Sequence, residues 1–222
     1  MADEPYRIKY PKTADCSLST IEELVESGIQ QGWETSHDGE TNGLLYNGPL
    51  NDYTSQRHPK KNVLQDLSEH RRGSITFWVD NIDFSLSLYA TWERFNDLSG
   101  FSFCVDPVHY RQDAEDVTNT IIQIATTIYN VLDQPVAFSS ISIDDTSHVH
   151  QLLEGQLTDV YWLLLLPPTL VERLDQSIIE TDLFWFNERL PDGGHILVAT
   201  ANPLSFTPSL KEELRAKLAL SK

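Results

Sequence analysis

The residues best suited to chemistry are two histidines and two aspartates that fall within seven positions of the sequence. Asp144 and Asp145 follow an apolar segment, and His148 and His150 come directly after them. Imidazole nitrogens and carboxylate oxygens are the groups with which proteins hold zinc and similar divalent metals. The cluster therefore raises the hypothesis of a metal-assisted hydrolase. The alternative is a polar loop in which Asp145 or Ser147 caps a helix, and no distant second group of ligands favours the metal.

A further histidine lies beside a glycine turn. His195 follows Asp192-Gly193-Gly194, so its imidazole could act as a base that an acid orients. A histidine that belongs only to a hairpin turn is the commoner explanation. The sequence has no G-x-S-x-G nucleophile elbow, no phosphate-binding or dinucleotide-binding glycine loop and no H-E-x-x-H. These features favour a role without catalysis and without a cofactor.

Acidity is the most unusual property of the composition. The chain has 33 acidic residues against 16 basic ones, which gives a net charge of −17. Such a charge repels phosphate backbones and disfavours nucleic acid as a partner. Two explanations stay open: an acidic surface adapted to a high-salt cytosol, or an acidic face that attracts a basic protein.

The location of the chain is expected from two further features. No apolar run reaches the roughly 18 residues that would span a bilayer, so a membrane is not an expected partner. The N-terminal residues include two acids and lack the basic and apolar regions of a secretory signal. We therefore expect a cytosolic protein.

Four residues of the central segment could form a surface for a protein partner. Trp78 and Tyr89 occupy strand positions that need not face the core, and Asp80 and Asp83 flank them. Large rigid aromatic side chains anchor interfaces, and charged rims steer association. The alternative is that the second half of the chain packs on this surface, so that the aromatic side chains belong to the core.

The central segment itself predicts an antiparallel sheet covered by a helix. Apolar and polar residues alternate along 75–80, 82–91 and 101–106, which is the pattern of strands with one buried face. In 113–134, apolar residues recur at steps of three and four, which is the spacing of one helical face. We expect this helix to cover the apolar face of the three strands.

The remaining segments extend this plan on both sides. A capping box at Ser19 and Glu22 predicts a helix start, with Gly32 as the end of that helix. Gly73 is the expected stop of a second helix. In chain order, the expected elements are a strand at 6–10, a helix over 19–32, a loop at 38–59 with a short strand at 44–46, and a helix over 60–72. After the central segment they are a strand at 136–143, a helix at 148–157, a buried strand at 160–166, a helix at 169–174, a hairpin of 183–190 with 195–201, and a helix from Thr207 with a capping box at Ser209 and Glu212.

The predicted fold class is α+β, with mainly antiparallel sheets and helices packed on one face. Both parts of the chain pass through strand, helix and strands in a similar order. We therefore expect a single domain, 1–222, that is built of two similar halves at about 1–135 and 136–222.

Segments of the second half resemble some immunity proteins of bacterial polymorphic-toxin systems. The shared pattern is an aromatic strand, a helix that begins P-x-x-V-x-x-L, a glycine turn, an apolar strand and a final Asn-Pro. These segments are 160–168, 170–174, 192–198 and Asn202-Pro203. The resemblance implies a non-enzymatic cytosolic protein that sequesters a toxin domain, and it implies no particular binding residues. The composition also resembles that of uncharacterised proteins from salt-loving microbes.

The leading hypothesis is a protein-binding module of immunity type whose acidic surface engages a basic toxin domain. The alternatives are a metal-dependent hydrolase at Asp144–His150 and a halophile protein whose acidity serves salt tolerance alone.

Overall fold

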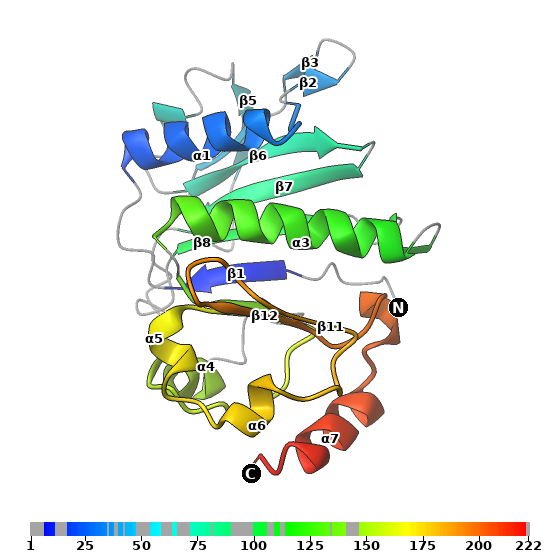
Figure 1. The fold of residues 1–222 in the computed structure, drawn as a ribbon. Coiled ribbons are helices and arrows are strands. Elements are labelled where there is room, and N and C mark those ends of the chain that lie inside the picture. Colours follow the sequence, from blue (N-terminus) through cyan, green and yellow to red (C-terminus); the bar gives the residue numbers. More distant parts are fainter. Residues whose placement is uncertain are drawn as a thin grey trace.

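A single antiparallel sheet of ten strands forms the centre of the protein (Figure 1). The computed structural model describes residues 7–11, 17–34, 36–37, 40–41, 43–47, 54–58, 64–65, 72–80, 82–89, 100–105, 109–111, 114–133, 135–140 and 147–220. From one edge of the sheet to the other, the strands are β11 (Phe186–Arg189), β12 (His195–Val198), β10 (Leu163–Leu166), β9 (Ala137–Ser140), β1 (Arg7–Pro11), β8 (Gly100–Val105), β7 (Ile82–Tyr89), β6 (Arg72–Val79), β4 (Gly43–Asn47) and β5 (Thr54–His58). A separate pair is formed by β2 (Ser36–His37) and β3 (Glu40–Thr41).

The helices surround this sheet. They are α1 (Leu18–Gln30), α3 (Ala114–Val131), α4 (Ser147–Leu153), α5 (Pro168–Val171), α6 (Gln176–Ile179) and α7 (Pro208–Lys217), with 3-10 turns at His109–Arg111 and Pro203–Ser205. In Figure 1, α1 and α3 lie side by side on the sheet, and α4 to α7 gather beyond β11 and β12 on the side away from α3. The predicted α+β class with antiparallel strands is confirmed.

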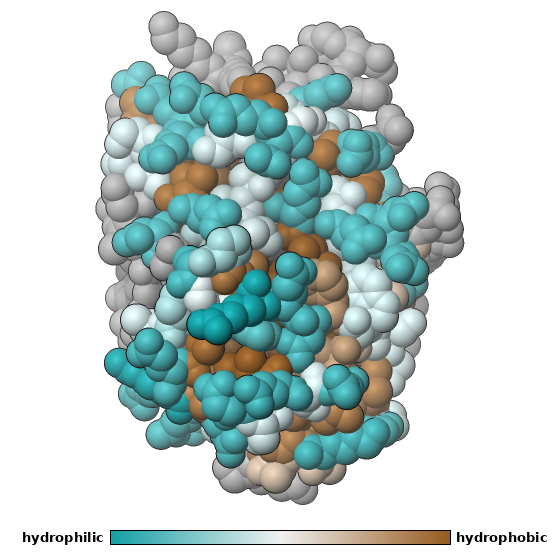
Figure 2. Space-filling view, viewed as in Figure 1, coloured by the Kyte–Doolittle hydropathy of each residue, from teal (hydrophilic) through white to brown (hydrophobic). Residues whose placement is uncertain are grey.

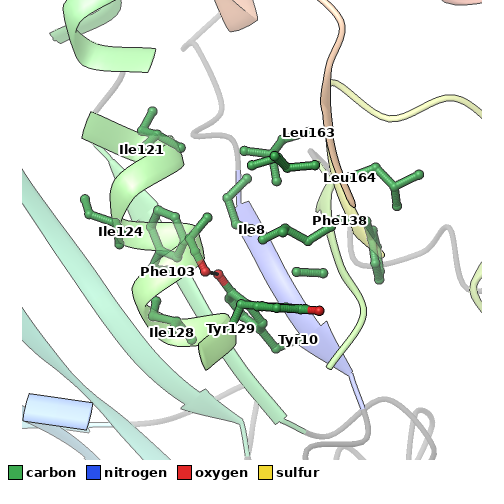
Figure 3. Packing of buried hydrophobic residues seen from close by; sticks show 14 of the residues in the cluster. Ile8, Tyr10, Phe103, Ile121, Ile124, Ile128, Tyr129, Phe138, Leu163 and Leu164 are labelled. Atoms are coloured by element: carbon green, nitrogen blue, oxygen red, sulfur yellow. Dashed lines mark hydrogen bonds between the residues drawn. The ribbon is translucent and has the colours of Figure 1, made fainter. Parts of the chain in front are cut away.

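The central segment folds as its periodicity predicts. The alternating apolar residues of β6, β7 and β8 are buried; they are Ile75, Phe77, Val79, Ile82, Phe84, Leu86, Phe101, Phe103 and Val105. The buried face of α3 includes Ile121, Ile124 and Ile128, which Figure 3 shows beside the sheet. The hydroxyl of Tyr10 on β1 donates to the carbonyl of Ala125 at 2.9 Å, which ties helix and sheet together. The prediction that this helix covers these strands is confirmed.

Strand β1 joins the N-terminal and C-terminal parts of the chain. It pairs with β8 on one side and with β9 on the other, both antiparallel. Strands from before and after residue 135 therefore share one sheet and one continuous hydrophobic core. The similarity of two halves stays a prediction.

One predicted helix start is wrong by two residues, and both predicted capping boxes are wrong. α1 begins at Leu18, because Ser17 is the N-cap and its hydroxyl accepts the N–H of Thr20 at 3.2 Å. The box at Ser19 and Glu22 therefore lies inside the helix. The expected start of the last helix is confirmed, because α7 begins at Pro208 with Thr207 as its N-cap. The hydroxyl of Thr207 accepts the N–H of Leu210, so the box at Ser209 and Glu212 does not cap this helix. Pro168 and Pro208 occupy the first turns of α5 and α7, as proline at these positions predicts.

The loop expected at 38–59 and the helix expected after it differ from the structure. Segment 38–59 contains β4 and β5, which form a hairpin that extends the sheet beyond β6. The strand expected at 44–46 is confirmed within β4. Of the helix expected over 60–72, Leu64 and Gln65 are helical. Gly73 does not stop a helix, because Arg72 and Gly73 belong to β6, where Gly73 pairs with Leu88.

The C-terminal strands are covered on both sides. All four leucines of β10 and all four residues of β12 are buried, although successive side chains point to opposite faces of a strand. α7 is anchored by a buried carboxylate: Asp159, 2 % exposed, accepts a hydrogen bond from Lys211 and lies 3.8 Å from Arg215. Such burial of a charge is tolerated because it is paired.

Candidate functional site

A pocket of about 720 Å³ opens between α5, α6 and β11. Its lining combines apolar, acidic and basic side chains: Val171, Glu172, Gln176, Ile179, Glu180, Thr181, Asp182, Phe184, Trp185, Asn187, Arg189 and His195. Figure 2 shows apolar brown atoms among teal ones on the lower part of the molecule, where Figure 1 places α5 and α6. Concave sites with an apolar lining and a few convergent polar groups are the usual places of ligand binding.

His195 lines this pocket and is buried. It is the first residue of β12 and pairs with Arg189 of β11. Nε2 of His195 is 2.5 Å from Oδ1 of Asn187, its diagonal neighbour across the two strands. The amide nitrogen of Asn187 donates to the carbonyls of Ile179 and Thr181 at 2.7 and 2.8 Å. Because both amide donors are used, Oδ1 faces His195 as an acceptor, and His195 carries its proton on Nε2.

The charge state of His195 follows from its surroundings. Burial of the ring, and then the positive charge of Arg189, lower the pKa of His195 below its ordinary value. The imidazole is therefore neutral at pH 7, and its Nδ1 keeps a lone pair. In the part of the chain that the structure describes, no hydrogen bond reaches this second nitrogen.

The rim of the pocket is predominantly acidic. Glu172, Glu180 and Asp182 are exposed, and Arg189 is the basic side chain among the lining residues. Trp185 is 38 % exposed and is one of the few large hydrophobic side chains that face solvent in the described residues. An aromatic side chain beside carboxylates is suited to hold a cationic group.

Removing the imidazole is expected to change how stability depends on pH. A folded-state pKa below the unfolded value means that the unfolded chain binds the proton first as the pH falls. The stability that the neutral, buried imidazole contributes to the folded chain is present above about pH 6.5, and it is lost as the pH decreases below this value. In urea titrations, the stability difference between the wild type and His195→Gln should therefore narrow from pH 7.5 to pH 5.5.

The matched variant is His150→Gln, which removes an exposed imidazole from α4 outside the pocket. A wild-type minus His195→Gln difference that stays constant over this pH range would contradict a neutral, buried His195.

Asp192, the acid beside the glycine turn, has a role that does not involve His195. The carboxylate of Asp192 accepts the hydroxyl of Tyr129 at 2.7 Å and the N–H of Gly194 at 2.9 Å. Burial, this hydrogen bond and the negative charge of Asp192 raise the pKa of Tyr129. Asp192 therefore fixes the β11–β12 turn to α3, and its described hydrogen bonds do not include His195. The amide of Asn187 takes the orienting position instead.

The structure separates the two histidines of the expected metal cluster. Asp144 and Asp145 lie outside the described residues. His148 and His150 are both in α4. Side chains two positions apart on a helix are rotated by about 200° about the helix axis, so these two imidazoles point to nearly opposite sides of α4. Nδ1 of His148 is 2.9 Å from the hydroxyl of Thr158. Within the described ranges, no group of three or more His, Cys, Asp or Glu side chains could hold a metal ion. The metal-dependent hydrolase stays a prediction.

The surface expected at Trp78, Asp80, Asp83 and Tyr89 is partly described. Trp78 is half-buried on β6 and pairs with Asp83 of β7. Asp80 is exposed and has a φ of 50° in the turn between these strands. Alternation along β6 directs Trp78 away from the face of Phe77, which α1 and α3 cover. The side chains of Asp83 and Tyr89 lie outside the description, so the interface at these four residues stays a prediction.

Sequence reasoning missed most of the pocket. Of its lining residues, His195 alone had been singled out as a site, and for a different reason. A usable signal was present: six acidic residues and two arginines lie between 172 and 192, around an aromatic triplet at 184–186.

One comparison with known proteins gives a result. No family model and no curated protein matches the chain. Among solved structures, the chain is similar to the "Pseudomonas aeruginosa T6SS protein PA0821", with a TM-score of 0.50 and 12 % identity over 97 % of this chain and 72 % of that one. Within the described ranges, no helix has the length and apolarity that crossing a bilayer requires. The chain thus shares the fold of a T6SS protein over nearly its whole length.

Proposed function

We propose that this protein is an immunity-type module that binds and neutralises a basic toxin domain in the cytosol, without catalysing a reaction. The observation that carries the proposal is the acidic pocket with its exposed Trp185. The likeness to a T6SS protein supports it, because toxins and their neutralising partners accompany such systems. The resemblance of segments 160–203 to immunity proteins points in the same direction.

The charge of the chain suits such a partner. A net charge of −17 accelerates encounter with a basic protein and weakens association with acidic ones. Exposed aromatic side chains at the centre of an interface contribute much of the binding energy. Trp185 lines the pocket together with Glu172, Glu180 and Asp182, so an exposed aromatic side chain and carboxylates belong to the same site.

Salt adaptation alone explains the charge but not its arrangement. A halophilic surface requires acidic residues over the whole molecule and has no need of a pocket with an exposed tryptophan. The pocket therefore favours binding over the halophile alternative.

The test is neutralisation in living cells. The domains encoded by the neighbouring genes are expressed from one plasmid, and this chain from another, and the test uses the domain that stops growth. We expect wild-type protein to restore growth, and the variant E172K/E180K/D182K to fail because the acidic rim has become basic.

The matched control is E22K/E23K/E26K, which makes the same change in net charge on the exposed face of α1. It should restore growth as the wild type does. The proposal is wrong if the wild type gives no protection, and the pocket is not the interface if both triple variants behave alike.

A further inference from the structure

The pocket lining includes a hydrogen-bond acceptor, Nδ1 of His195, to which no described group of the chain donates. His195 is 8 % exposed, and its Nε2–H is given to Asn187. The contacts described for the chain leave Nδ1 without a donor. Nδ1 is not among the buried polar atoms that lack a partner, so it is accessible and can accept a hydrogen bond from a group that enters the pocket.

The charges around this acceptor select a cationic donor. Glu172, Glu180 and Asp182 line the same pocket as the imidazole, and Arg189 opposes them with one positive charge. Three carboxylates against one guanidinium leave the pocket negative. A neutral donor, such as an amide, would make no use of this excess.

The aromatic side chains select the shape of the cation. Phe184 and the exposed Trp185 line the pocket, and the rings of Trp185 and Phe186 are 6.1 Å apart. A planar guanidinium stacks on such rings and carries five N–H donors in a fixed arrangement, whereas an ammonium is compact and strongly hydrated. The volume of about 720 Å³ accommodates a complete arginine side chain.

We propose that the pocket between α5, α6 and β11 binds an arginine side chain of the partner, with its guanidinium donating to Nδ1 of His195 and pairing with Glu180 and Asp182. This inference rests on the proposed function, since it names the residue type by which the partner is recognised. Trp185 covers the guanidinium face, and Asn187 is a positioning residue that keeps the proton of His195 on Nε2.

The experiment uses a small probe in place of the partner. N-acetyl-arginine methylamide is titrated into the full chain, and the nitrogen resonances of the His195 ring and the Trp185 indole are followed by NMR. We expect saturable shifts of both, with Nδ1 moving as an acceptor that gains a hydrogen bond. N-acetyl-lysine methylamide should bind at least about tenfold more weakly, because it lacks the planar donor array.

Two variants separate pocket binding from general attraction. E180Q/D182N removes two rim charges from exposed positions, so the fold should persist, and it should weaken arginine binding at least about tenfold. E22Q/E23Q makes the same change in net charge on α1 and should leave it unchanged. The absence of saturation, equal affinity for the lysine probe, or equal behaviour of the two variants would overturn the arginine assignment.

The result is independent of the neutralisation test. If the arginine probe does not bind but the wild type still restores growth, the arginine assignment is wrong and the immunity function stands. If the probe binds and no toxin is neutralised, the pocket assignment stands and the immunity function is wrong.

Discussion

Replacing Ile124 by aspartate is expected to abolish the folded state. Ile124 is fully buried on α3, and Figure 3 shows it within the cluster that includes Phe103 and Ile128. Removing a buried isoleucine side chain costs about 2–5 kcal/mol, and an unpaired buried carboxylate costs several more. Since a whole domain is stable by only about 5–15 kcal/mol, the sum is comparable with the total. Circular dichroism should show no cooperative thermal transition.

The control for Ile124→Asp is the neighbouring residue. Gln123 is exposed on the same helix, and Gln123→Asp should change the free energy of unfolding by less than about 0.5 kcal/mol. An Ile124→Asp protein with the melting temperature of the wild type would show that α3 does not cover the sheet in this way.

Gly28→Ala is expected to destabilise the protein, although alanine is the better helix former. A Cβ at Gly28 would lie 2.0 Å from Cε3 of Trp33. Trp33 is 2 % exposed, and its ring centroid is 5.4 Å from that of Phe77 and 5.0 Å from that of Phe84, so it has no room to retreat. Overpacking costs about 1–3 kcal/mol or more, against a gain of about 1 kcal/mol in helix propensity. Urea denaturation should show a net loss of stability.

A second substitution identifies the cause. Trp33→Leu removes the ring that the new methyl group meets, so Gly28→Ala should be much less costly, or stabilising, in that background. An equal effect of Gly28→Ala in both backgrounds would show that contact with Trp33 is not the reason.

The part of the fold that could be predicted is the part with regular periodicity. Long alternating or helical patterns and local connections occur together in β6, β7, β8 and α3. The buried residues of these elements therefore follow from the sequence. β5 reads Thr-Ser-Gln-Arg-His, with no alternation of apolar and polar residues, and it is a strand because β4 pairs with it. The position of β1 between β8 and β9 depends on two long-range ladders that no local pattern encodes.

The contacts of the candidate site also depend on long-range pairing that no local pattern encodes. A glycine turn next to His195 drew attention to Asp192, which is close in sequence. The register of β11 against β12 instead brings Asn187 to the imidazole and directs Asp192 toward Tyr129. The pocket also depends on which faces of α5 and α6 remain uncovered, and this is decided by tertiary packing.

Binding of a basic toxin is tested most directly by calorimetric titration of this protein with the growth-stopping domain from the neutralisation test. We expect a 1:1 complex whose affinity falls steeply between about 0.05 M and 0.5 M salt, because opposite charges steer and hold the partners. Binding should be lost in E172K/E180K/D182K and kept in E22K/E23K/E26K. No heat of binding at either salt concentration, or a complex that both variants form equally well, would contradict it.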